Sequence, residues 1–123
     1  MGSGHLERAL AAVEEALATA RRRRTRLAEC IGSIGRARVL LRFGRPDDPA
    51  EIAADLGHAL ALVEATGAKS NEPFIRVELA RLAALTGDEP TRLSELRAAQ
   101  RLFAAMGAAA RVERVAALLG ASA

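Results

Sequence analysis

The sequence contains no tryptophan or tyrosine, and its only aromatic side chains are Phe43, Phe74 and Phe103. Alanine and leucine therefore supply most of the apolar side chains, and both residues are strong helix formers. β-Branched residues are scattered singly, and no alternating apolar–polar run extends beyond a few residues. Because such alternation is typical of a half-buried strand, we expect no β-strands. The sequence predicts an all-α fold.

Cysteine is almost absent as well, since Cys30 is the only one. A single cysteine excludes an intrachain disulfide and a cysteine metal cluster, and fits a reducing, cytoplasmic setting. We expect Cys30 to be a buried structural thiol. No apolar run approaches the roughly 20 residues that span a bilayer, and no signal peptide is recognisable, so we expect no membrane association. Residues 1–5 resemble a cloning remnant, which leaves one expected domain at 6–123.

Lysine is the third scarce residue, because Lys69 is the only lysine among 18 basic side chains. These are nearly balanced by 15 acidic residues, which leaves a net charge of +3. A mildly basic total does not by itself predict nucleic-acid binding.

Five glycines each follow a stretch of apolar residues spaced three and four apart. Glycine adopts the left-handed conformation just past a helix end without a steric penalty, so these positions predict helix stops. Alternate stops lie 43 and 40 residues apart, about the length of one helix pair, which is typical of a helical repeat array. The glycines are Gly44, Gly67, Gly87, Gly107 and Gly120.

These stops and the caps beside them predict six antiparallel helices. Asp48 and Asp88 are the expected N-caps of the third and fifth, and the fourth, apolar over a wide arc, should be the most buried. Gly32 and Gly35 weaken the second helix, so we expect close packing of a neighbouring helix there. The helices are expected at about 6–22, 25–43, 49–66, 73–86, 89–106 and 108–119.

The segment from Pro73 to Gly107 resembles a tetratricopeptide repeat. Leu79-Ala80 stands where that repeat has its Leu-Gly pair, and Gly87-Asp88 stands at its turn. Ala99, Phe103 and Met106 match its small, aromatic and small positions. The resemblance implies a short α-solenoid of stacked helix hairpins, although the second helix is longer than in the repeat and the signature tryptophan and tyrosine are missing.

Residues 65–80, 85–88 and 95–107 are similar to the C-terminal tetratricopeptide tails of bacterial signalling proteins. Those proteins carry a class III adenylate/guanylate cyclase domain and a STAND-type ATPase, and related tails occur in transcriptional activators. The resemblance implies a sensor or scaffold region. The chain has no glycine-rich phosphate loop, so no catalytic role, cofactor or metal is carried over to it.

Arginines on two expected helices are candidate partner-binding groups. By the tetratricopeptide comparison, Arg38 and Arg81 stand at equivalent groove-facing positions, where a guanidinium binds a carboxylate of an acidic peptide in bidentate fashion. The alternative is an ion pair within the chain, with Glu29 and Glu78 as available partners. The full candidate set is Arg38, Arg42, Phe74, Val77 and Arg81.

The strongest charge feature is a run of arginines between the first two helices. It offers contacts to the phosphates of nucleic acid or to an acidic partner. The alternative is a helix C-terminus, whose dipole favours cations, followed by a solvated turn. The cluster, called the arginine cluster below, is Arg21, Arg22, Arg23, Arg24 and Arg26.

No other side chains suggest catalysis. Asp47-Asp48 fits capping better than acid–base chemistry; His58 suits a surface or packed position; and the serines lack a nucleophile-elbow context. We therefore expect a non-enzymatic interaction module that binds a peptide or neighbouring domain on a concave surface lined by the second and fourth helices. We also expect it to form a homodimer through an exposed helix face. The alternatives are a nucleic-acid or regulator-associated domain and a self-assembling helical building block.

Overall fold

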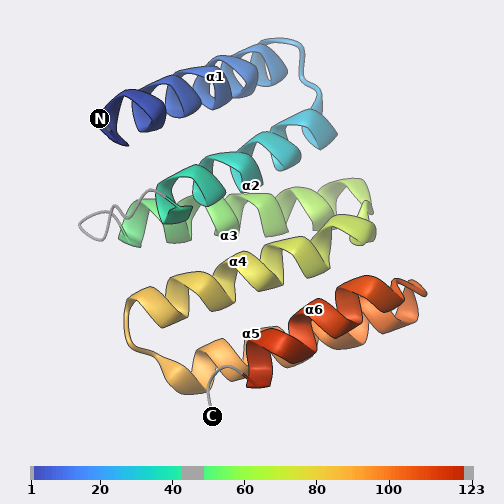
Figure 1. Cartoon of the computed structure of the whole chain (residues 1–123). Helices are drawn as coiled ribbons and strands as arrows, with labels where there is room; N and C mark the ends of the chain where they lie inside the picture. The colour runs from blue at the N-terminus through green and yellow to red at the C-terminus, as the bar shows by residue number, and fades with distance from the viewer. Residues whose placement is uncertain (1, 43–48, 121–123) are drawn as a thin grey trace. The chain divides into compact units, whose positions relative to one another are not determined.

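The computed structural model describes residues 2–42 and 49–120 (Figure 1). They form six α-helices and one short 3-10 turn, and this described part of the chain contains no strand, which confirms the all-α prediction. The expected stop at Gly44 and the expected cap Asp48 lie outside it. The elements are α1 (Gly2–Arg22), α2 (Arg26–Arg42), α3 (Pro49–Thr66), η1 (Lys69–Asn71), α4 (Glu72–Leu85), α5 (Glu89–Ala105) and α6 (Ala109–Gly120).

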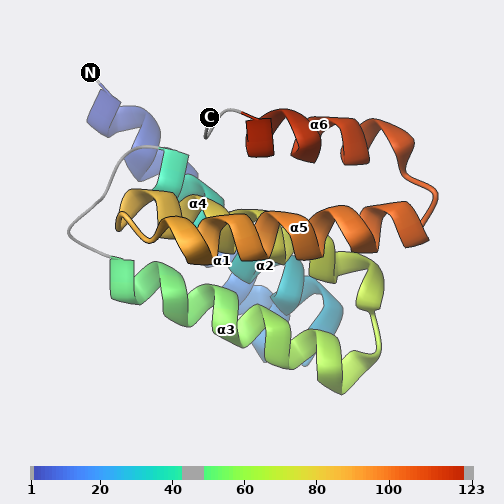
Figure 2. The ribbon, with the colours of Figure 1, turned by 90° about the horizontal axis from the view of Figure 1, so that it is seen from below.

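Contacts along the chain divide it into two compact units, residues 1–69 and 70–123. Unit 1 holds α1, α2 and α3, and unit 2 holds α4, α5 and α6. Within each unit, consecutive helices lie side by side and run antiparallel (Figures 1 and 2), as their short connections predict. The boundary of one domain at 6–123 stays a prediction. Helix α1 begins at Gly2, four residues before the expected start.

Three glycines end helices as predicted. Gly67, Gly87 and Gly107 have φ angles of 72°, 78° and 72°. At Gly87 the helix closes with a hydrogen bond from Asp88 N to Ala83 O of 2.8 Å, the pattern of a Schellman motif. Helix α6 ends at Gly120, as predicted, but Gly120 is the last helical residue and does not have the left-handed backbone of the other three.

The predicted cap of the fifth helix is present. Asp88 precedes α5, and its side chain accepts a hydrogen bond from Thr91 N at 3.2 Å. This bond satisfies one of the backbone donors left free in the first turn of a helix. The sequence therefore fixes both ends of the α4–α5 connection: a glycine ends one helix and an aspartate starts the next.

In unit 1 the close approach predicted at Gly32 is real. A Cβ atom at this position would lie 2.9 Å from Leu17 Cδ2 and 3.0 Å from Leu17 Cγ, so α1 rests on the bare backbone of α2. Leu17 is itself buried and has little room to move. At Gly35 the nearest contact would be Val13 Cγ2 at 3.9 Å, an ordinary distance, so the expectation of close packing is wrong there.

We predict opposite effects for alanine at two helical glycines. Gly32→Ala gains helix propensity but pushes on Leu17, and we expect it to lower the free energy of unfolding by about 1 kcal/mol. Gly57→Ala, in α3, meets nothing within 4 Å and should raise that free energy by about 1 kcal/mol. Urea unfolding followed by circular dichroism measures both. Equal stabilisation by the two substitutions would show that the Gly32–Leu17 contact is not tight.

In unit 2 the core forms around Phe103 of α5. Its ring meets that of Phe74 edge to face, with centroids 5.1 Å apart and planes at 82°. Val115 brings α6 onto the same cluster. Helix α4 is the most buried of the three, as predicted, because its exposed residues are only Arg81, Ala84 and Leu85.

Candidate functional site

Arg36 ties the three helices of unit 1 together. From α2 it donates to Glu14 of α1 at 3.4 Å, to Asp55 of α3 at 2.5 Å and to Glu51 of α3. A polar cavity of about 340 Å³ opens beside it, lined also by Leu17. Burial raises the pKa of the Asp55 carboxyl, and the Arg36 guanidinium opposes this rise. Since three carboxylates from α1 and α3 share the guanidinium, we interpret this network as stabilising the packing of the three helices.

A second polar contact joins α2 to α3. Glu29 Oε2 lies 2.5 Å from His58 Nε2 and 3.4 Å from Arg21 Nε. The hydrogen bond from His58, with the charge of His58 and then Arg21, lowers the pKa of Glu29. His58 is on the surface, as expected. Glu29, a suggested partner for the groove arginines, forms ion pairs with His58 and Arg21.

We predict a pH-dependent cost for Glu29→Gln. Because the hydrogen bond with His58 lowers the pKa of Glu29 in the folded chain, its ionised form contributes stability above the unfolded pKa, and this contribution is lost as the pH falls through the folded pKa. The variant should lose about 1 kcal/mol at pH 7, and this deficit should shrink towards zero as the pH falls through the folded pKa of Glu29. Urea midpoints across this range measure the difference. A constant gap at all pH values would contradict the ionic contact.

The arginine cluster extends from the end of α1 through the following turn to Arg26, the first residue of α2, and all five side chains are exposed. This agrees with the alternative of a helix C-terminus followed by a solvated turn; a ligand role stays a prediction.

The turn after α1 has one feature that the sequence did not reveal, because Arg24 has a φ of 54°. Thr25 N bonds to Ala20 O at 2.9 Å and Arg24 N to Arg21 O at 3.2 Å, again a Schellman motif. Arginine stands here in the glycine position.

We predict that Arg24→Gly stabilises the chain. The left-handed backbone costs a residue with a Cβ roughly 1 kcal/mol, and glycine avoids this cost. Part of the resulting gain in stability is offset by the greater conformational freedom of glycine in the unfolded chain. We expect a net rise of about 0.5 kcal/mol in the free energy of unfolding. Arg24→Ala removes the same charge without relieving the backbone and is the matched control. Equal gains from both would assign the effect to charge.

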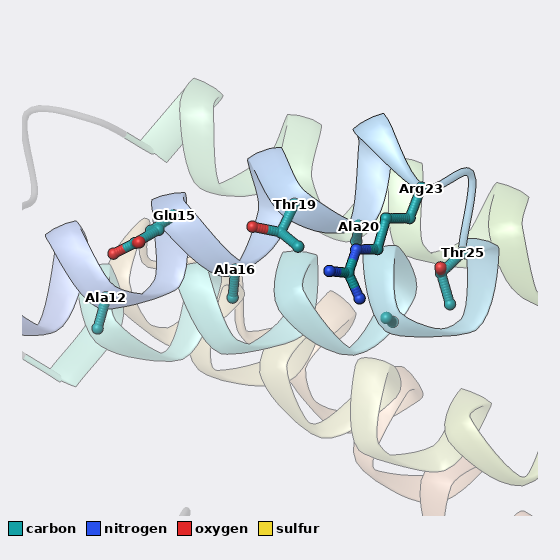
Figure 3. A pocket seen from close by; sticks show the side chains of 8 residues that line it. Ala12, Glu15, Ala16, Thr19, Ala20, Arg23 and Thr25 are labelled. Carbon is teal, nitrogen blue, oxygen red and sulfur yellow. The ribbon is translucent and has the colours of Figure 1, made fainter.

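A shallow groove runs between α1 and the start of α2 (Figure 3). It encloses about 560 Å³. Its apolar lining is entirely alanine, and its polar lining includes one acidic and one basic side chain, Glu15 and Arg23. The sequence analysis did not predict a groove between these two helices, although alanines at positions 12, 16 and 20 repeat at helical spacing. The lining residues are Ala12, Glu15, Ala16, Thr19, Ala20, Arg23, Thr25 and Ala28.

Helix α2 exposes one face that is half aliphatic and half basic. Leu27 is 46% exposed and Ile31 is 55% exposed. Arg38 and Arg42, both candidate partner-binding residues, are exposed on the same helix. At 3.6 residues per turn, the four positions fall within an arc of about 60°. The spacing of apolar residues over 25–43 puts Leu27 on the same side as Cys30 and predicts that it is buried, and this prediction is wrong because Leu27 is exposed.

The three unit 2 candidates have partners inside their own unit. Phe74 and Val77 pack against the core cluster, and the Arg111 guanidinium lies 5.0 Å from the centre of the Phe74 ring. Arg81 is exposed and donates at 3.1 Å to both carboxylate oxygens of Glu78, which is 1% exposed. The suggested ion pair with Glu78 is thus present, and a partner-binding role for these residues stays a prediction.

The remaining chemical groups fit structural roles. Cys30 is fully buried and its thiol donates to Ala59 O at 3.5 Å, and burial raises the pKa of this thiol. A buried, protonated thiol is a poor nucleophile. Over residues 2–42 and 49–120 no three histidine, cysteine or carboxylate side chains are grouped to hold a metal ion. None of the helices described is long and apolar enough to span a bilayer.

The two features that could bind a partner, the groove and the exposed face of α2, therefore both lie in unit 1. No protein-family model, curated protein or solved structure matches this chain.

Proposed function

We propose that this chain is a non-enzymatic protein-interaction module. The observation that carries the proposal is the exposed face of α2, where Leu27 and Ile31 lie on the same side of the helix as Arg38 and Arg42. Large aliphatic side chains left in solvent are unfavourable unless a partner covers them. Arginines beside them supply carboxylate recognition with defined geometry.

Selection from a phage-displayed peptide library tests this function. We expect peptides that bind the chain and fail to bind the Arg38→Glu/Arg42→Glu variant. Arg97→Glu/Arg101→Glu, which reverses two exposed arginines of α5, is the matched control and should keep binding. A library that yields no specific peptide for the parent chain would remove the proposal.

We also propose that the helices belong to a tetratricopeptide-like α-solenoid, a scaffold region of a larger bacterial signalling protein. Support comes from the resemblance described above and from helix stops at Gly67 and Gly107, 40 residues apart, which share a left-handed backbone. A coding sequence that continues upstream into a cyclase and a STAND ATPase would support this context. A different upstream domain would exclude it.

Self-association remains part of the proposal, because an exposed aliphatic face favours pairing of two copies as well as binding of a partner. Light scattering coupled to size-exclusion chromatography measures it over a range of concentrations. We expect a dimer that Ile31→Glu converts to a monomer. A monomer at every concentration would exclude self-association through the α2 face.

Nucleic acid is the second candidate partner, and the exposure of the five side chains in the arginine cluster favours it. Binding of duplex DNA should then weaken steeply with added salt, because each phosphate contact releases counterions. Replacing the five arginines by alanine should abolish it. Failure to bind DNA at low salt would remove this candidate.

A further inference from the structure

The groove and the exposed face of α2 meet in one surface of unit 1. Ala28 lines the groove, and Ile31 lies one helical turn further along α2 on the same side. Alanine supplies the apolar lining of the groove, and Leu27 and Ile31 are exposed on α2 within three residues of Ala28. Small side chains next to larger aliphatic ones suit the ridge of another helix, because ridges of one helix pack into the grooves of its neighbour.

Positive charge lies at both ends of this surface. Arg23 lines the groove where α1 meets α2 (Figure 3), whereas Arg38 and Arg42 lie in the second half of α2. From the start of α2 to Arg38 is 12 residues, which corresponds to about 18 Å at a rise of 1.5 Å per residue. The surface thus has a basic end, an apolar middle and a second basic end.

We propose that this surface, called the α1–α2 site, takes an amphipathic helical segment of a partner protein that has carboxylates at both ends and alanine or leucine between them. This inference rests on the proposed interaction function and names its partner. A helix of about 12 residues spans the distance between the two basic ends. Each end would be held by a guanidinium–carboxylate pair, and the middle by burial of Ile31 and the alanines.

The composition of the groove favours such a segment over a nucleic acid. Glu15 lines the groove with Arg23, so a phosphate backbone that followed the groove would meet a carboxylate. No aromatic side chain lines it for stacking. A peptide segment avoids this repulsion by placing a neutral or basic side chain opposite Glu15, and this adds orientation to the binding.

Fluorescence anisotropy on the full chain tests the α1–α2 site. The probe is a fluorescein-labelled peptide of about 14 residues with two glutamates at each end and alanine and leucine between them. We expect the probe to bind and a version with lysine in place of glutamate not to bind. Arg23→Glu, Arg38→Glu and Ile31→Glu should each weaken binding about tenfold or more, because each removes a contact and adds a repulsive charge.

The control variant is Arg101→Glu, an exposed arginine of α5 in unit 2, which should leave binding unchanged. Circular dichroism confirms that each variant is folded. The proposal is overturned if the lysine peptide binds equally well, if Arg101→Glu weakens binding as much as Arg23→Glu, or if duplex DNA binds through these arginines while the peptide does not. Library peptides that bind independently of Arg23 and Ile31 would also overturn it, yet leave the interaction function standing.

Discussion

Phe103→Ala should lower the free energy of unfolding by about 3–5 kcal/mol, the largest effect that we expect from one substitution. Phe103 is 2% exposed and lies at the centre of the unit 2 core. Its removal takes away a large buried apolar surface and leaves a cavity, and it also ends the edge-to-face contact with Phe74. Unit 2 spans only residues 70–123, and a core of this size has little stability to lose.

Urea unfolding at 222 nm and amide hydrogen exchange measure this loss, and exchange should accelerate throughout α4, α5 and α6. Phe103→Leu keeps most of the volume and is the control, with an expected cost of about 1–1.5 kcal/mol. Phe74→Leu should cost less than Phe103→Ala, because Phe74 is only partly buried. A loss below 1 kcal/mol for Phe103→Ala would show that α6 does not depend on this ring.

Arg36→Met should lower the free energy of unfolding by about 2–3 kcal/mol. The substitution removes the cation that Glu14, Glu51 and Asp55 share. Asp55 is mostly buried, and leaving one member of a buried pair without its partner costs more than the pair contributes. We place the value below that of a fully buried pair because Glu14 and Glu51 are exposed and screened by solvent.

The pH dependence of this loss identifies its origin. Burial raises the pKa of Asp55 from its usual range, and removing Arg36 should raise it further. The deficit of the variant should therefore shrink as the pH falls through this pKa, because the protonated carboxyl no longer needs a cation. Asp55→Asn added to Arg36→Met should recover much of the loss at pH 7. A pH-independent deficit would assign the cost to packing of the arginine side chain.

The sequence predicted helix ends well where their chemistry is local. Gly87 and Asp88 act on backbone groups only a few residues away, so their identity alone was sufficient. At Arg24 the same backbone turn is made by a residue with a Cβ, and no rule based on glycine finds it. The only sign of this turn in the sequence is that the apolar patterns of the first two helices both end at the arginine run, with no glycine between them.

Contacts between helices were harder to predict, since they depend on how the helices are rotated and shifted along each other. Arg36 reaches Asp55 across 19 residues of sequence, and nothing in the spacing of either helix shows this. Leu27 falls at the edge of the apolar stripe of α2, where a small rotation moves a side chain from the core to solvent. The groove beside it depends on the same rotation.

Labelling of the buried thiol of Cys30 can measure how often unit 1 opens. Cys30 is fully buried and bonded to Ala59 of α3, so a thiol reagent can reach its sulfur only when the structure around α2 and α3 opens. It is the single cysteine of the chain, and labelling therefore reports on unit 1 alone. Under conditions where closing is faster than labelling, the modification rate gives the equilibrium between closed and open forms.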